Sequence, residues 1–263
     1  MKGDDNVLDL RVLGTFDVLA GGRLVNIGGP QMRRVMARLV VGTGWTVGVG
    51  TLAEELWGAH PPADAYRTVR TYVSRLRAAL RQAVGNVADE LLGTRQPGYH
   101  LRVDPGALDA ARFEGLAAAG HAALHAGQPQ LAIEQLTSAL GLWHGDAYAE
   151  FDESPVFAAE AARLDSLRLS AIEARVEAAL ALGLDDQVVD ELEALIRTHP
   201  GRERLWEQFM TALYRSGRQA DALAAFRTAR ATLADGYGVE PSPRLVEVHR
   251  QVLHHDAGLT AAR

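Results

Sequence analysis

Arginine side chains gather on one face of a predicted helix that runs from Pro62 to Val84. Its apolar residues recur at steps of four, three and four, the spacing of a single buried helical face; they are Val69, Val73, Leu76 and Leu80. The opposite face carries polar and basic side chains, namely Arg67, Arg70, Thr71, Ser74, Arg75, Arg77 and Arg81. No acidic residue occurs between Asp64 and Asp89, so the sequence leaves this positive face uncompensated.

These residue types have the chemistry that recognition of double-stranded DNA requires. A guanidinium group matches two oxygens of a phosphate, or the O6 and N7 atoms of guanine. An α-helix is about 10–12 Å wide, which the major groove of B-DNA accommodates. A solvated basic surface helix is the alternative interpretation, and this helix alone does not decide between the two.

The distribution of charge favours the first interpretation. Residues 1–104 contain 13 basic and 10 acidic side chains, a net charge of +3. Residues 105–263 contain 14 basic and 23 acidic side chains, a net charge of −9, and the two parts sum to the −6 of the whole chain. We therefore expect the N-terminal part, and not the acidic remainder, to bind a polyanion.

Sequence signatures of catalysis and metal binding are absent. The chain has no cysteine, which excludes disulfides, thiolate zinc sites and cysteine nucleophiles and suits a reducing cytoplasm. Lys2 is the only lysine, so no Walker A loop is present, and neither H-E-x-x-H nor G-x-S-x-G occurs. His121 and His125 stand one helical turn apart without an evident third ligand, and surface or packing roles are favoured. We expect no enzyme activity, no cofactor and no metal.

Targeting signals are also missing. The N-terminal residues lack the basic and apolar regions of a signal peptide. The longest uncharged run, Leu39 to Ala53, is too short for a membrane span and contains glycines. We expect no association with a membrane.

The elements predicted before and after the helix at Pro62–Val84, hereafter the arginine helix, indicate the fold that contains it. Strands at Leu10–Leu19 and Arg23–Ile27 form a predicted hairpin, followed by helices at Pro30–Val41 and Gly50–Trp57 with a short strand at Thr46–Val47. After the arginine helix, two strands are predicted within Leu91–Val103, joined by the turn Gln96-Pro97-Gly98. This order is the outline of a winged helix with an added N-terminal sheet. The arginine helix would enter the major groove, and the final hairpin would place Arg95 at the minor groove.

The second part of the chain has helical periodicity from about Asp109 onward. An internal repeat appears when Gly127, Gly183 and Gly217 are aligned, because apolar residues follow each glycine at offsets of five, six and nine. The last two glycines are 34 residues apart, the period of tetratricopeptide helix pairs. A longer helix, about Pro155 to Leu182, interrupts the array.

Three segments resemble the DNA-binding domain of OmpR-type response regulators: TLAEELWG, RTVRTYVSRLRAAL and GTRQPGYHLRV. The resemblance implies base contacts by Arg67, Arg70, Thr71, Ser74 and Arg75, and a minor-groove contact by Arg95. It implies DNA-backbone contacts by Trp57, Arg77, Thr94 and Tyr99. Core packing is an equal alternative for Trp57. Arg81 is better explained as a solvated residue at the helix end, and Arg33 and Arg34 either touch phosphate or keep their helix soluble.

The segment HPGRERLWEQFMTALYRSGRQADALAAFRTARATLADGYGVEPSPRL resembles the bacterial transcriptional activator domain. Both domains in this order resemble the Streptomyces antibiotic regulatory protein family. The resemblance implies a mainly α fold with a small β part: an OmpR-like winged helix in residues 1–104 and tetratricopeptide-like helices in residues 105–263.

The family resemblance also implies a function. A member is a sequence-specific activator that binds direct repeats near promoters as a tandem pair of protomers. It recruits RNA polymerase holoenzyme, including the sigma factor. It regulates the genes of secondary metabolite (antibiotic) biosynthesis, and it is associated with the nucleoid in the cytoplasm. The alternative is a helical-repeat adaptor that binds protein only, with the winged helix as a scaffold. The arginine face without acidic residues argues against the adaptor, because a protein that binds only other proteins has no reason to keep this face free of acids.

Overall fold

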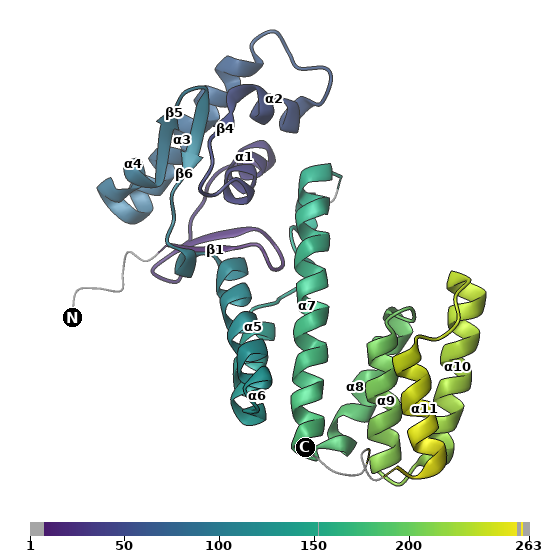
Figure 1. Ribbon diagram of the computed structural model, residues 1–263. Coiled ribbons are helices and arrows are strands. Elements are labelled where there is room, and N and C mark those ends of the chain that lie inside the picture. Colours follow the sequence, from purple (N-terminus) through teal and green to yellow (C-terminus); the bar gives the residue numbers. More distant parts are fainter. Residues whose placement is uncertain (1–7, 152, 257–258, 260–263) are drawn as a thin grey trace, which may run out of the picture. The chain divides into compact units, whose positions relative to one another are not determined.

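The computed structural model describes residues 8–151, 153–256 and 259. The chain divides into two compact units, the first made of residues 1–115 and 139–168 and the second of residues 116–138 and 169–263. Residues 105–115 and 139–168 thus group with the N-terminal part of the chain. Helices predominate and two small sheets occur among the described residues, which is the mainly α fold class expected from the sequence (Figure 1).

The first sheet contains β1 (Leu8–Arg11), β2 (Asp17–Ala20) and β3 (Arg23–Leu24) in that order, all antiparallel. The prediction of one continuous strand over Leu10–Leu19 was wrong, because the chain turns between Val12 and Phe16. The backbone of this turn bonds to residues far along the sequence instead of to a neighbouring strand, as described below.

The winged helix follows in the predicted order. It comprises α1 (Pro30–Val41), β4 (Val47–Gly48), α2 (Val49–Trp57), α3 (Ala65–Val84), β5 (Leu92–Arg95) and β6 (Gly98–Leu101). The second sheet has the order β4-β6-β5, which makes β5 an edge strand (Figure 1). Gly48 is the N-cap residue of α2. The 3-10 helix η1 (Gly85–Val87) and the short helix α4 (Ala88–Leu91) were not predicted.

The buried stripe of α3 is the one predicted from its spacing. Val69, Val73, Leu76 and Leu80 are each at most 1% exposed. Helices α1 and α2 both pack against α3. Burial of a valine or leucine side chain contributes roughly 1.5–3 kcal/mol, so this stripe fixes which face of α3 remains in solvent.

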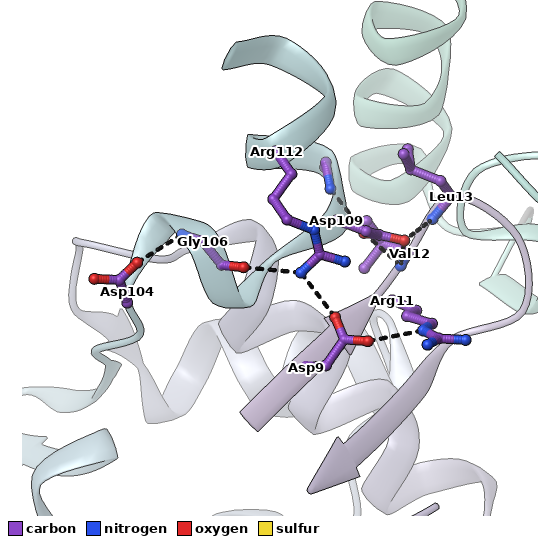
Figure 2. Close-up of polar contacts among 9 residues, drawn as sticks. Asp9, Arg11, Val12, Leu13, Asp104, Gly106, Asp109 and Arg112 are labelled. Atoms are coloured by element: carbon purple, nitrogen blue, oxygen red, sulfur yellow. Dashed lines mark hydrogen bonds and ion pairs between the residues drawn. The ribbon is translucent and has the colours of Figure 1, made fainter. Parts of the chain in front are cut away.

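The N-terminal sheet packs on the segment that follows the winged helix. Asp109, at the start of α5 (Asp109–His125), accepts hydrogen bonds from the backbone N–H groups of Val12 and Leu13 at 2.9 and 3.0 Å (Figure 2). The carbonyls of the same two residues accept from the N–H groups of Tyr148 and His144 at 2.9 and 2.8 Å. These bonds explain why the chain turns after β1, since its polar groups are satisfied outside the sheet.

Aromatic side chains also join the turn after β1 to residues 139–168. The ring of Phe16 meets that of Phe151 at 5.9 Å, in the 3-10 helix η3 (Ala149–Phe151). Phe151 stacks on Phe157 at 4.8 Å, near the start of α7 (Pro155–Ala181). Residues 139–168 therefore complete the core of the first unit.

The second unit is built from helices alone in its described residues: the later part of α5, all but the last two residues of α6 (Pro129–Leu140), the later part of α7, α8 (Asp185–Thr198), α9 (Glu203–Arg215), α10 (Gln219–Tyr237) and α11 (Pro243–His254). The packed pairs α8 with α9 and α9 with α10 form one core around Leu192, Leu205, Met210, Leu213 and Ala222.

The repeat found in the sequence is a repeat of helix ends. Gly127, Gly183 and Gly217 have left-handed φ values of 69°, 72° and 75°. After each glycine, the next N–H bonds back to a carbonyl five residues earlier, as Gln128 does to Ala123 and Arg218 to Leu213. This is the Schellman arrangement, in which glycine avoids the steric cost of the left-handed conformation. The next helix begins two residues after each glycine.

Candidate nucleic-acid interface

The face of α3 opposite the buried stripe is exposed. Arg67, Arg70, Thr71, Ser74 and Arg75 are all exposed. None of the three arginines makes a side-chain hydrogen bond or ion pair with the residues that the structure describes. Thr71 donates its hydroxyl hydrogen to the carbonyl of Arg67 at 3.0 Å, which leaves its oxygen lone pairs open. The face therefore presents free guanidinium donors and open hydroxyl acceptors.

Acidic residues close to α3 do not neutralise this face. Asp89, on α4, binds Arg81 at 2.6 Å, one turn before the end of α3. The hydrogen bond from Arg81 lowers the pKa of the Asp89 carboxyl. Arg81 is thereby held at the end of the helix, where the sequence suggested a solvated residue and not a DNA contact.

The wing is the hairpin of β5 and β6. Arg95 pairs with Gly98 across its tip, and its exposed side chain has no partner among the residues described. Gly98 also lies against β4, where an added Cβ atom would be 1.9 Å from the carbonyl oxygen of Val47. Only glycine fits this close approach of two backbones, which accounts for the glycine in the GYHL segment.

The positive charge of the wing comes from arginine alone at neutral pH. Burial, and then the nearby charges of Arg102, Arg95 and Arg77, lower the pKa of His100 in β6. The imidazole is therefore neutral near pH 7.

The expected DNA-backbone residues differ in their surroundings. Trp57 is half-buried at the end of α2, and Thr94 is exposed on β5. Tyr99 is 8% exposed, and the guanidinium carbon of Arg77 lies 5.5 Å from the centre of its ring. Arg77 also donates hydrogen bonds to the carbonyl of Leu92 and the hydroxyl of Thr94, both at 2.8 Å. Arg77 and Tyr99 are thus engaged within the protein.

Two arginines of α1 make ion pairs within the first unit. Arg33 binds Glu150 at 2.7 Å and donates to the carbonyl of Phe16. The hydrogen bond with Glu150 raises the pKa of Arg33. Arg34 lies 3.8 Å from Glu55 of α2. The sequence carried no signal for the bond between Arg33 and Glu150, because its partners stand 117 positions apart.

The described residues contain no group of three or more histidine, cysteine, aspartate or glutamate side chains arranged to hold a metal ion. In the same residues no helix combines the length and apolar character that crossing a bilayer requires. His125 bonds to the carbonyl of His121 at 2.7 Å.

Comparison with protein families agrees with this architecture. The family described as transcriptional regulatory protein, C terminal, matches residues 27–101, and the bacterial transcriptional activator domain matches residues 108–253. Regulatory protein DnrI of Streptomyces peucetius is 39% identical over 256 residues, which are 96% of this chain and 94% of DnrI. The chain belongs to the Streptomyces antibiotic regulatory protein family. This family consists of DNA-binding transcriptional activators and not of enzymes.

Other relatives are longer than this chain. Regulatory protein AfsR of Streptomyces coelicolor is 40% identical over 97% of this chain, which spans 25% of AfsR. Among solved structures, EmbR of Mycobacterium tuberculosis, in complex with a low-affinity phosphopeptide, superposes with a TM-score of 0.91 at 36% identity. That match covers 95% of this chain and 65% of the EmbR chain. The family's two-domain core is therefore common to proteins of different lengths.

Proposed function

We propose that this protein binds direct repeats in promoter DNA through α3 and the wing. The observation that carries the proposal is the exposed, acid-free part of α3 that bears Arg67, Arg70 and Arg75, because these three arginines have no partner among the described residues. Arg67, Arg70, Thr71, Ser74 and Arg75 read base edges in the major groove. Trp57 and Thr94 border the DNA backbone, and Arg95 enters the minor groove.

The activating partner is RNA polymerase holoenzyme, including the sigma factor. Residues 105–263 carry a net charge of −9, which disfavours close approach to DNA and leaves the helical repeats for protein contacts. A second protomer, bound in tandem on the neighbouring DNA repeat, supplies another helical-repeat surface for protein contacts. The family is named for antibiotic regulation, and we infer that the regulated genes belong to a secondary-metabolite cluster. The site of action is the nucleoid in the cytoplasm.

Selection of bound duplexes from random DNA, followed by footprinting on a native promoter, tests this function. We expect a recurring motif in two copies of the same orientation. A protein-only adaptor is the alternative function, and it would enrich no motif. Enrichment of a single inverted repeat would contradict tandem binding, because a head-to-tail pair requires half-sites of the same direction.

A further inference from the structure

Arg77 joins the recognition helix to the wing. Its Nε atom donates to the carbonyl of Leu92 and its Nη2 atom to the hydroxyl of Thr94, each at 2.8 Å. The guanidinium lies over the ring of Tyr99 in β6, 5.5 Å from the ring centre. One side chain of α3 therefore contacts both strands of the hairpin.

The carbonyl of Leu92 requires such a donor. Strand β5 lies at the edge of its sheet, and the carbonyl of Leu91 accepts from Arg102, which follows β6. Successive carbonyls of a strand point in opposite directions, so that of Leu92 points away from β6. Arg77 supplies the hydrogen bond that this edge of the sheet lacks.

Thr94 stands next to Arg95, the residue at the wing tip. A wing held at Leu92 and Thr94 has a defined height relative to α3, so Arg95 and the exposed α3 face hold a fixed separation. Reading of the two DNA grooves requires such a separation, because an arginine displaced from the narrow minor groove loses its favourable potential.

We propose that Arg77 is a positioning residue that holds the wing against α3 and so couples the minor-groove contact of Arg95 to major-groove binding by α3. The coupling between the two DNA contacts rests on the proposed function. The attachment of the wing to α3 does not, because it can be tested in the free protein. It differs from a phosphate contact by Arg77, which needs only a positive charge. We call the contacts of Arg77 with Leu92, Thr94 and Tyr99 the clamp. The clamp needs the planar guanidinium, because two acceptors and an aromatic ring are contacted at once.

The first test measures hydrogen exchange of the free protein in residues 92–101 by mass spectrometry. Arg77→Ala and Arg77→Lys should both speed exchange in the wing, by roughly three- to tenfold, the effect of losing hydrogen-bonded anchors. Arg81→Ala is the matched control on the same helix, because Arg81 binds Asp89 and not the wing. Wing exchange that is unchanged in Arg77→Ala would overturn the clamp. Exchange increased equally throughout the first unit would also overturn it, since that reports general destabilisation.

The second test measures dissociation constants on cognate sites with A·T-rich or G·C-rich flanks. The wild type should prefer A·T-rich flanks, and Arg95→Ala should lose that preference. Arg77→Ala and Arg77→Lys should lose most of it although Arg95 is present, whereas Arg81→Ala should retain it. Equal weakening on both flanks, with recovery in Arg77→Lys, would identify a phosphate contact and contradict the coupling.

The two tests separate this inference from the function on which it rests. A wild type without flank preference would contradict the minor-groove role of Arg95 in the proposed function, and with it the coupling. Faster wing exchange in the two Arg77 variants would in that case still support the clamp itself.

Discussion

Arg75 and Arg81 stand on the same helix but have different surroundings. Arg75 has no partner in the described part of the chain, whereas Arg81 is held by Asp89 at 2.6 Å. An arginine that donates to no protein group retains all of its N–H donors for DNA. Availability to DNA therefore depends on neighbouring carboxylates as much as on residue type.

For Arg75→Ala we expect a loss of about 1–3 kcal/mol on the cognate site and little loss on random DNA, because a bidentate contact to guanine is sequence-specific. Fluorescence anisotropy on both duplexes measures the difference. Arg81→Ala serves as the control and should change neither affinity appreciably. Equal losses on every sequence for Arg75→Ala would mean that this residue contacts phosphate and does not read bases.

Arg95 occupies the tip of the wing without a protein partner among the described residues. Arg95→Ala should weaken binding most on sites with A·T-rich flanks, because a narrow minor groove concentrates negative potential. Titrations on matched sites that differ only in their flanks check this expectation. A loss independent of flank composition would assign Arg95 to the DNA backbone.

Two elements far apart in the sequence meet at Asp109. Its carboxylate is 2% exposed and accepts from Val12, Leu13 and Ala110, which ties the N-terminal sheet to the start of α5. Burial raises the pKa of this carboxyl, while the backbone N–H groups act against that shift. The stability of the sheet therefore depends on a residue beyond the winged helix.

Asp109→Asn should destabilise the protein by about 1–3 kcal/mol, since an amide replaces one acceptor oxygen and leaves a buried N–H unpaired. Chemical denaturation measures the change. Asp104→Asn is a suitable control, because exposed Asp104 only caps the 3-10 helix η2 (Pro105–Ala107), at 2.7 Å from the N–H of Gly106, and asparagine caps equally well (Figure 2). Similar stabilities of the two variants would show that the Asp109 bonds contribute little.

The whole protein is expected to act as a tandem pair on DNA. Direct repeats read from one side of the duplex should recur about every 10–11 bp or a multiple of that spacing. Insertion of about five base pairs, roughly half a turn, should abolish cooperative occupancy and transcription by polymerase holoenzyme, and a full-turn insertion should partly restore both. Occupancy insensitive to the insertion would show that the protomers bind independently.

Deletion of the acidic part is a poor test of activation in this protein. A chain ending at residue 104 lacks Asp109, His144, Tyr148 and Glu150, which all bond to the N-terminal part. Such a chain would lose both stability and the activating surface. Substitutions on the exposed faces of the second unit separate the two effects.

Much of this architecture was predictable from the sequence because its signals are local. Apolar spacing within α3, proline at the start of α1 and glycine after the repeat helices act over a few residues, and they located helix ends to within a few positions. The exposed arginine face followed from the same spacing, since burial of one face dictates the other.

The tertiary structure alone revealed the remaining features. The turn between β1 and β2, the role of Asp109 and the contact of Arg33 with Glu150 depend on partners up to 136 positions away, the separation of Val12 from Tyr148. The attachment of Arg77 to the wing depends on an unpaired carbonyl of an edge strand. No local pattern encodes these contacts. A buried polar group binds whichever partner the packed core brings within about 3 Å, and that choice is made only when the chain has folded.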